Sequence, residues 1–363
     1  MNGLILVAGG RGQRFSGGKG KMELKVFKGW SLLDYWLFRL ETLKGLFQDI
    51  VIVTDSPLLN SKDIKVAPPG DSRKKSVANG FYELAKVDKV LVHDGARPLA
   101  TNNLFERVLA WLDAFPVVVP AIDVEDALRK REGNSTVPFS RQGLIRVQTP
   151  QGFRYDVLKA VLEAAHEDVD EASVAQQLGW EVHVVEGERK NLKVTFPEDV
   201  FLQEHMFRQI QGIGWDFHRF SENRPLVLGG VQIEDATVGL ESWTDGDVII
   251  HAVADAFLSM LGEGDLGTLY PNNEFWKGRD STSILADVME RMGEKGILVD
   301  RVTVLLLADK PKLKHWIEPI MRNLSSLVNA PVYLSITRSE GIIGKDLDGM
   351  ISLAFVNGVE VKR

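Results

Sequence analysis

The segment Glu186–His218 most constrains how this chain can fold, because it separates two stretches with different candidate chemistry. Within it, Pro197 followed by two acidic residues favours a helix start, since carboxylates in the first turn complement the helix dipole. The sequence predicts that this helix runs to about Gln211 and breaks at Gly212 and Gly214. We therefore expect a domain boundary there, with the two glycines in a short linker.

The chain has 363 residues, enough for two domains with complete cores, which we expect at residues 1–209 and 212–363. Its net charge of −7 argues against a nucleic-acid surface, so basic residues should gather at sites for anionic small molecules. The absence of cysteine excludes disulfides, thiolate metal sites and cysteine nucleophiles. No apolar run is long enough to cross a bilayer and no basic signal segment is present, so we expect a cytoplasmic protein that does not bind membranes.

The first domain opens with the continuous apolar run Gly3–Val7, which is typical of a strand buried on both faces. The segment Ala8–Arg14 (AGGRGQR) follows at once. Its glycines allow backbone N–H groups to approach an anion, and Arg14 can pair with phosphate oxygens. Gly17–Lys21 continues this cationic stretch. The loop matches neither the dinucleotide fingerprint nor a P-loop, so a phosphate site and a solvated Gly/Lys loop both remain open.

Strands and helices then alternate, which predicts an α/β domain with a mostly parallel sheet and ligands at the carboxyl ends of its strands. The expected strand Lys89–Val92 ends in His93–Pro98 (HDGARP). Asp94 in this segment is a candidate Mg²⁺ ligand, because Mg²⁺ prefers one or two carboxylates together with phosphate oxygens. The alternative is a carboxylate that only caps the loop.

In the second domain, Asp216 and His218 stand two residues apart, so on an extended segment both side chains point to one face. His251 lies on an expected helix from about Val248 to Leu261. Together these residues supply two imidazoles and one carboxylate without thiolates. Three such ligands with an open fourth position are what a catalytic zinc site needs.

Two further carboxylates share a helix face with His251, because Asp247 and Asp255 precede and follow it by four residues. Either could orient the His251 ring by accepting a hydrogen bond. The alternative is that His251 is a satisfied polar residue with no metal. The rest of this domain again alternates strands and helices, which predicts a second α/β domain.

Six strings in the first domain, in this order, resemble the 2-C-methyl-D-erythritol 4-phosphate cytidylyltransferases: AGGRGQR, GDSRKKSVANG, HDGARP, TPQGF, DEAS and NLKVT. The resemblance covers about Met1–Gln209 and implies a Rossmann-like nucleotidyltransferase sheet. It also implies attack of methylerythritol 4-phosphate on the α-phosphorus of CTP, with release of pyrophosphate. Catalysis of this kind depends on positioning and electrostatics.

The same resemblance implies residue roles in the first domain. Arg14 and Lys21 would stabilise the charge that develops on the transferred phosphate, while Arg141 and Lys193 would seat the methylerythritol phosphate. Mg²⁺ or Mn²⁺ would accompany the nucleotide phosphates, bound by Asp94. The residues expected to hold the nucleotide are Ala8, Gly9, Gly10, Gly70, Ser76 and Asp94.

Two positions depart from that family. The family lysine stands in a Pro-Lys-Gln string, whereas Lys21 here lies in Gly-Lys-Met-Glu, so Lys19 or Lys25 could take its role. The family's Asp-Thr pair is replaced here by Asp123-Val124-Glu125 or by Asp126-Ala127, so a hydroxyl expected near the sugar phosphate is missing.

Strings in the second domain resemble the 2-C-methyl-D-erythritol 2,4-cyclodiphosphate synthases: DFH, TDGDVIIHAVADA, GDLG, YPN, DKPK and SITRSEG, over about Gly212–Lys362. Members of that family are trimers with active sites between subunits. The implied reaction is attack of the substrate's 2-phosphate on its own β-phosphorus, which expels CMP. Zn²⁺ (or Mn²⁺ or Co²⁺) would be bound by Asp216, His218 and His251, and Glu340 would help to hold a second divalent cation.

This second resemblance also assigns catalytic and substrate positions. Trp243 and Arg338 occupy the two catalytic positions, where the family usually has histidine and threonine. The residues expected to bind substrate are Thr244, Asp265, Leu266, Gly267, Thr337, Ser339 and Glu340.

Together the resemblances imply a bifunctional enzyme of the methylerythritol phosphate route to isoprenoids, with CTP and methylerythritol phosphates as substrates. The alternative is a non-catalytic scaffold or regulator that binds cytidine nucleotides; within enzymes, it is a nucleotidyltransferase for another sugar phosphate. The first family dimerises and the second trimerises, so we expect a homo-oligomer that is at least a trimer, with a hexamer favoured.

Overall fold

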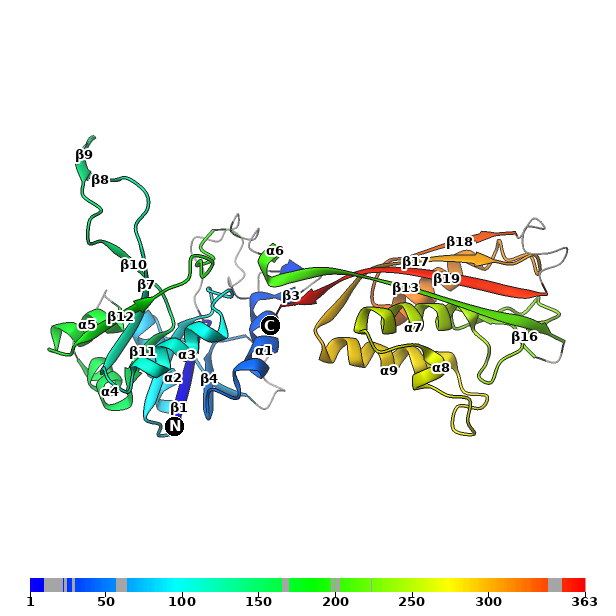
Figure 1. The fold of residues 1–363 in the computed structure, drawn as a ribbon, viewed down its shortest axis with the longest axis horizontal. Coiled ribbons are helices and arrows are strands. Elements are labelled where there is room, and N and C mark those ends of the chain that lie inside the picture. Colours follow the sequence, from blue (N-terminus) through cyan, green and yellow to red (C-terminus); the bar gives the residue numbers. More distant parts are fainter. Residues whose placement is uncertain are drawn as a thin grey trace. The chain divides into compact units, whose positions relative to one another are not determined.

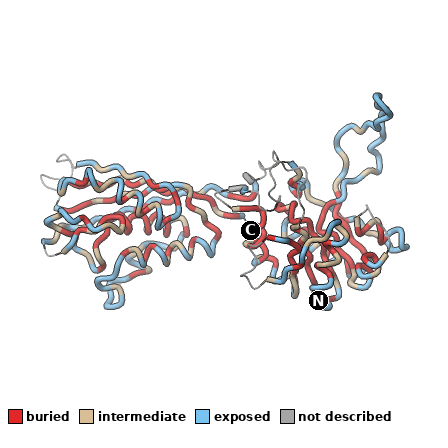
Figure 2. Tube along the Cα trace, turned by 180° about the vertical axis from the view of Figure 1, so that it is seen from behind, coloured by how far each residue is buried: buried red, intermediate tan, exposed pale blue. Residues whose placement is uncertain are grey.

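The computed structural model describes most of the chain in side-chain detail. The described residues are 1–9, 22, 25–27, 30–56, 64–164, 170–196, 199, 203–222, 224–338 and 348–362. They form two compact units, Met1–Met206 and Phe207–Lys362 (Figure 1), and buried residues fill the interior of each (Figure 2). No helix in these ranges combines the length and apolarity that crossing a membrane would require.

The first unit is built on an eight-stranded sheet with the order β10-β7-β11-β6-β1-β4-β5, and β12 also pairs with β7. Its strands are β1 (Asn2–Val7), β4 (Asp49–Val53), β5 (Lys65–Ala67), β6 (Lys89–Asp94), β7 (Val117–Asp123), β10 (Ile145–Val147), β11 (Gln151–Arg154) and β12 (Val182–Glu186). Most pairs are parallel, and only β10 and β11 run antiparallel to their neighbours among the described strands. The prediction of a mostly parallel sheet is confirmed.

Helices and short strands complete this unit (Figure 1). They are β2 (Lys25–Phe27), β3 (Trp30–Ser31), α1 (Leu32–Leu43), α2 (Arg73–Glu83), α3 (Asn102–Trp111), α4 (Tyr155–Glu163) and α5 (Glu171–Gln177). Polar side chains define the helix starts: Ser31 and Asp34 form a capping box on α1, and the Ser72 hydroxyl accepts from the Lys75 N–H on α2. Such caps fix where each helix leaves the strand end before it.

A two-stranded ribbon, β8 (Leu128–Glu132) and β9 (Ser135–Phe139), extends from the sheet (Figure 1). Nearly all of its residues are exposed, and Gly133 has a positive φ of 59° in its turn. The sequence gives little sign of this ribbon, because its residues do not alternate toward a core. It follows Ala127, one of the two positions at which the expected hydroxyl could be missing.

The second unit has a five-stranded sheet with the order β16-β13-β19-β17-β18. Its strands are β13 (Phe207–Ser221), β16 (Gly239–Leu240), β17 (Ile297–Leu307), β18 (Val332–Thr337) and β19 (Gly349–Val361), with a small pair β14 (Val227–Leu228) and β15 (Val231–Gln232). Its helices are α7 (Val248–Leu261), α8 (Leu266–Leu269), α9 (Ser281–Glu294) and α10 (Ile317–Val328). The predicted helix Val248–Leu261 and the second α/β fold are confirmed.

One face of this sheet packs on α7, and the opposite face is exposed and apolar. Ile213 pairs with Phe355 on β19, and both Phe355 and Tyr333 are paired with the same β17 residue, so these side chains share one face. Ile213 is 61% exposed and Trp215 is 65% exposed. Single exposed apolar residues are ordinary, but a row of them across three strands marks an interaction surface.

The predicted helix to Gln211 and the predicted glycine linker are wrong. Among the described residues, a short helix α6 (Gln203–Met206) is followed directly by β13, which contains both Gly212 and Gly214. A Cβ on Gly212 would lie 2.0 Å from the carbonyl oxygen of Ala256 on α7. The glycines therefore allow a strand and a helix to pack closely; they do not form a hinge. Pro197, the predicted helix start, lies outside the described residues.

Candidate active sites

The first candidate site forms where β1 and β6 end side by side. These strands are parallel, and Val7 is paired with Asp94. Beyond β1, the Ala8 N–H donates to the Val53 carbonyl at 2.8 Å, and a Cβ on Gly9 would lie 2.4 Å from Pro69. The chain after β1 thus lies directly against the loop after β5.

That neighbouring loop contains two further predicted nucleotide residues. The Gly70 N–H donates to the Ser76 hydroxyl at 3.0 Å, which ties the loop to the first turns of α2. The structure therefore brings Ala8, Gly9, Gly70 and Ser76 to one edge of the sheet. Lys25 lies in β2. The predicted residues Gly10, Arg14, Lys19 and Lys21 lie outside the described part of the chain.

Asp94 is the buried carboxylate of this site. It accepts from the Lys193 ammonium at 2.7 Å and from the Arg73 guanidinium at 3.3 Å, and Arg97 Nε lies 4.0 Å away. Burial alone would raise the pKa of Asp94, but Arg73 and Lys193 outweigh it and hold that pKa well below its usual range. Asp94 is therefore an ionised group surrounded by cations.

The segment that carries Lys193 is held against the strand end by its own hydrogen bonds. The fully buried Asn191 donates to the Thr149 carbonyl at 2.8 Å, and its own carbonyl accepts from Arg97. The Val194 N–H donates to the Ala96 carbonyl at 2.8 Å. Lys193 itself is 44% exposed in its side chain, so its ammonium can reach both Asp94 and a ligand in solvent.

Sequence reasoning missed Arg73 as a member of this site. It begins α2 and ion-pairs with Glu171, which is buried at the start of α5, as well as with Asp94. A signal was present, because Arg73 lies in the string GDSRKKS and Glu171 in DEAS. Their pairing across the fold could not be inferred from two separate strings.

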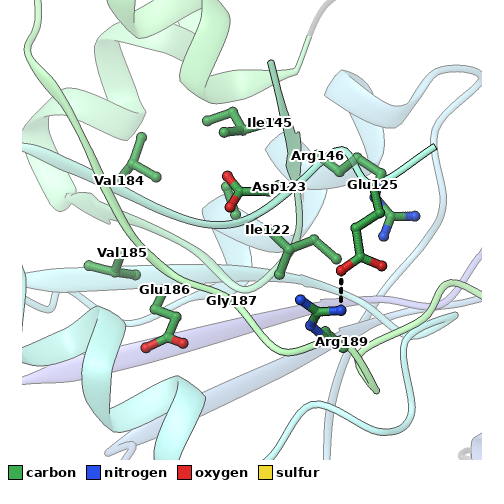
Figure 3. Close-up of a pocket in the computed structure, with 11 residues that line it drawn as sticks. Ile122, Asp123, Glu125, Ile145, Arg146, Val184, Val185, Glu186, Gly187 and Arg189 are labelled. Atoms are coloured by element: carbon green, nitrogen blue, oxygen red, sulfur yellow. Dashed lines mark ion pairs between the residues drawn. The ribbon is translucent and has the colours of Figure 1, made fainter. Parts of the chain in front are cut away.

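Arg141, predicted to seat the sugar phosphate, lies in the exposed turn before β10 and donates to the Glu125 carbonyl. Beside it is a pocket of about 340 Å³ in which Glu125 and Arg189 form an ion pair (Figure 3). Arg146 and Asp123 also line this pocket. The hydrogen bond described for Arg141 joins it to Glu125, and its part in seating the sugar phosphate together with Lys193 stays a prediction.

The second candidate site combines β13 with α7, and it contains all three predicted metal ligands. Asp216 Oδ2 lies 2.8 Å from His218 Nε2 and 2.9 Å from His251 Nδ1, and the two ring nitrogens are 3.0 Å apart. The three ligand atoms lie within 4.8 Å of one another. One carboxylate oxygen and two imidazole nitrogens converging from a strand and a helix are a donor set that suits a catalytic zinc ion.

Electrostatics in this cluster favour an anionic carboxylate. Burial alone would raise the pKa of Asp216, but hydrogen bonds from His218 and His251 outweigh that effect and hold the pKa well below its usual range. A half-buried carboxylate ionised beside two imidazoles is ready to bind a cation. The prediction that Asp216, His218 and His251 come together is confirmed, whereas the identity of the ion stays a prediction.

The expectation that Asp247 or Asp255 orients His251 is wrong. Asp247 caps α7 and accepts from the N–H groups of Ile249, Ile250 and the Gly229–Gly230 turn. Asp255 accepts from the Leu266 N–H at 2.8 Å. A shared helix face did not bring either carboxylate to the ring, because backbone donors already occupy both.

The His251 ring nitrogen that does not contact Asp216, Nε2, instead lies beside two hydroxyls. His251 Nε2 lies 2.9 Å from Ser281 Oγ and 3.1 Å from Thr244 Oγ1. Thr244 was predicted to bind substrate, whereas Ser281 was missed. In the sequence, Asp280-Ser281 only suggests a helix start, and Asp280 does cap α9.

The remaining predicted residues of this unit belong to three separate segments of the chain. Trp243 is 38% exposed and donates from its indole N–H to the Asn273 carbonyl at 2.6 Å. Asp265 caps α8, which contains Leu266 and Gly267. The other predicted substrate and catalytic positions lie at the end of β18: Thr337 is its last residue and Arg338 follows it, and both are exposed. Ser339 and Glu340 lie outside the described residues.

Comparisons with known proteins agree with both units. The family model of 2-C-methyl-D-erythritol 4-phosphate cytidylyltransferase (IspD) matches residues 3–209, and the YgbB family matches residues 210–357. The bifunctional enzyme IspD/IspF of Gluconobacter oxydans is 33% identical over 97% of this chain and 96% of its own length. Its counterpart from Campylobacter jejuni subsp. jejuni (strain 81-176) is 31% identical over 98% and 96%, respectively.

Among solved structures, the bifunctional IspDF from Campylobacter jejuni is 29% identical, covers 99% of both chains and has a TM-score of 0.48. A CDP-bound 2C-methyl-D-erythritol-2,4-cyclodiphosphate synthase is 32% identical over 42% of this chain and all of its own, with a TM-score of 0.38. The sequence relatives match both parts in the same order over nearly the whole chain. The chain therefore belongs to the bifunctional IspD/IspF enzymes, which transfer a cytidylyl group from CTP to 2-C-methyl-D-erythritol 4-phosphate and form 2-C-methyl-D-erythritol 2,4-cyclodiphosphate with release of CMP.

Proposed function

We propose that cytidylyl transfer takes place at the joined ends of β1 and β6. The observation that carries this proposal is the contact of 2.7 Å between Lys193 and the buried Asp94, with Arg73 and Arg97 around it. Cations that outnumber the carboxylates at the ends of parallel strands suit a substrate phosphate. Ala8 and the other predicted nucleotide residues of this edge would hold CTP.

Lys193 has a defined part in this proposal. When methylerythritol 4-phosphate binds, the Lys193 ammonium leaves Asp94 and pairs with the substrate phosphate. This pairing brings the attacking phosphate oxygens toward CTP. Asp94 then becomes available to Mg²⁺ or Mn²⁺, and such an ion, when bound, neutralises charge on the nucleotide phosphates. Arg14 and Lys21 are proposed to stabilise the transferred phosphate, and Arg141 to seat the sugar phosphate from the exposed turn, as the family resemblance implies.

For cyclisation, we propose that Asp216, His218 and His251 hold one Zn²⁺, or Mn²⁺ or Co²⁺ in its place. Such an ion, when bound, polarises the β-phosphate of the substrate as a Lewis acid. A set of three protein ligands leaves a fourth position for the substrate, and Asp265, which caps α8, is proposed to contact the substrate, as the family resemblance implies. Arg338 adds a cation where the family usually has threonine. The remaining assignments, which follow the resemblance, are substrate contacts of Thr244, Leu266, Gly267, Thr337 and Ser339 and a second divalent cation at Glu340.

We also propose a homo-oligomer that is at least a trimer, with a hexamer favoured. The exposed apolar face of the second sheet supports it, because Trp215, Ile213 and Tyr333 are each more than half exposed. Covering such a face by a like face around a three-fold axis closes a ring. The exposed ribbon β8–β9 offers a separate surface for a contact between two chains around a two-fold axis. A cytoplasmic location remains a prediction from composition.

Product analysis by ³¹P NMR tests both activities in one protein. With CTP and methylerythritol 4-phosphate, the expected products are pyrophosphate and the cytidylyl adduct; with the 2-phosphorylated adduct, they are CMP and a cyclic diphosphate. Lys193→Ala should raise KM for methylerythritol 4-phosphate in the first reaction. His251→Ala should abolish the second reaction and tight zinc binding while sparing the first. Nucleotide binding without turnover in either reaction would instead support a non-catalytic scaffold.

A further inference from the structure

The side of His251 that faces away from the triad is closed by a buried chain of polar groups. His251 Nε2 lies 2.9 Å from Ser281 Oγ, and the Ser281 hydroxyl donates in turn to Asp245 Oδ1. The Ser281 backbone N–H donates to the other oxygen of Asp245 at 3.0 Å. Ser281 is fully buried, so no solvent competes for its hydroxyl.

The direction of these hydrogen bonds follows from the groups themselves. A carboxylate only accepts, and a serine hydroxyl has one hydrogen to donate. Since Ser281 donates that hydrogen to Asp245, its oxygen can only accept at His251. The proton of a neutral His251 ring therefore lies on Nε2, and the Nδ1 lone pair points at Asp216 and His218. Thr244 Oγ1, 3.1 Å from Nε2, can accept from the same N–H.

We propose that Ser281, backed by Asp245, is a positioning residue of the cyclisation site. It fixes His251 in the Nε2–H tautomer, so that Nδ1 is always presented as a metal ligand. Ring tautomer and ligand orientation are commonly set by the hydrogen bond on the nitrogen that does not bind the ion. This inference rests on the proposed metal site, and it concerns Asp245 and Ser281, which have no other assigned function.

Asp245 also links the segment before α7 to the segment before α9. Its N–H donates to the Arg279 carbonyl at 3.0 Å, just before α9 begins at Ser281. A purely structural role of Ser281, as part of this link, would affect the melting temperature but not the protonation of the His251 ring. The two roles are therefore separable by experiment.

Two substitutions test the proposal from opposite directions. Ser281→Ala removes the nearer of two acceptors for the His251 N–H and leaves Thr244 Oγ1, 3.1 Å away, as the other. Asp245→Asn keeps the side-chain shape and its bond from the Ser281 N–H, but its NH₂ group in place of Oδ1 loses the bond from the Asp247 N–H and now donates to Ser281 Oγ. The serine hydroxyl must then turn to donate toward His251 Nε2, which favours the wrong tautomer. Ser283→Ala is the matched control, because Ser283 Oγ donates to the Asp280 carbonyl on the same helix turn.

The readouts are zinc affinity of the full-length protein, by competition with a chromogenic chelator, and the His251 tautomer in the metal-free protein, by ¹⁵N NMR of the ring nitrogens. Ser281→Ala and Asp245→Asn should each weaken zinc binding about 10-fold or more, and Asp245→Asn should move the ring proton to Nδ1. Ser283→Ala should behave as wild type. Should Ser281→Ala not fold, Asp245→Asn carries the test.

Unchanged affinity and tautomer in Asp245→Asn would overturn the proposal. Weaker zinc binding with an unchanged tautomer would also overturn it, because it would leave Ser281 only a structural role. A wild-type protein that binds no zinc would reject the metal site itself, which is a different failure. Cytidylyl transfer by the same samples reports whether the rest of the chain is intact.

Discussion

Substituting Gly214 by alanine tests how β13 is placed on α7. A Cβ on Gly214 would lie 2.2 Å from the Ala252 carbonyl oxygen and 2.3 Å from the Ala256 nitrogen. Both are backbone atoms of α7, so no side-chain rotation can relieve the contact. Since Cβ contacts below 3.0 Å are essentially never seen, the strand must move by about 1 Å in this close-packed interior.

That displacement acts on both stability and the metal site. Overpacking a buried contact costs about 1–3 kcal/mol, and each kcal/mol lowers the melting temperature of a unit of this size by about 2–4 °C. Asp216 follows Gly214 by two residues on β13, whereas His251 lies on α7. A shift of 1 Å between reacting groups can slow a reaction on the order of 100-fold. We expect Gly214→Ala to lower the melting temperature and to reduce cyclisation by about that factor.

The matched control is Gly293→Ala in α9 of the same unit, because a Cβ there meets nothing within 4 Å. Alanine in a helix is about 0.5–1 kcal/mol more favourable than glycine, so this variant should melt at or above the wild-type temperature. Calorimetry and ³¹P NMR of the cyclisation reaction measure both effects. If Gly214→Ala melted and turned over like Gly293→Ala, the close packing of β13 on α7 would be refuted.

Two further outcomes follow from single side chains, one buried and one exposed. Burial lowers the pKa of His93 from its usual 6.5 to about 3, so only the unfolded chain takes up this proton between those values. The free energy of unfolding should fall as pH decreases through that window, by up to about 1.4 kcal/mol per pH unit, and His93→Gln should flatten the profile in pH-dependent denaturation. Trp243→Phe removes the N–H bond to the Asn273 carbonyl, so hydrogen exchange should quicken around Asn273; exchange like that of wild type would contradict this role.

The sequence correctly predicted those site residues whose positions depend on one strand or helix, or on the ends of neighbouring strands. Asp216 and His218 share a face because they stand two residues apart on a strand, and that rule held. Asp94 was placed at a strand end because the run before it is apolar, and β6 does end there. In such cases the chain's own periodicity fixes which side chains meet.

The predictions that proved wrong concern residues whose positions depend on contacts between elements. Gly212 and Gly214 were interpreted as helix breakers, although they alternate with exposed residues in β13 and serve its packing on α7. The partner of His251 Nε2 comes from the start of α9, thirty residues along the chain, and not from the same helix face. Such pairings depend on how α9 packs on α7, which no local period encodes.

Each site contains a carboxylate that is buried (Asp94) or half-buried (Asp216), and its surroundings decide what the site can bind. Asp94 is paired with Lys193 and Arg73, so the first site carries an excess of fixed cations and attracts phosphate. Asp216 faces two imidazoles, which are neutral when they act as ligands, so the second site keeps a negative charge and attracts a metal ion. Each carboxylate is ionised for a different reason: guanidinium and ammonium charges in one case, ring hydrogen bonds in the other. The same residue type thus favours an anion beside it at the end of β6 and a cation beside it within β13.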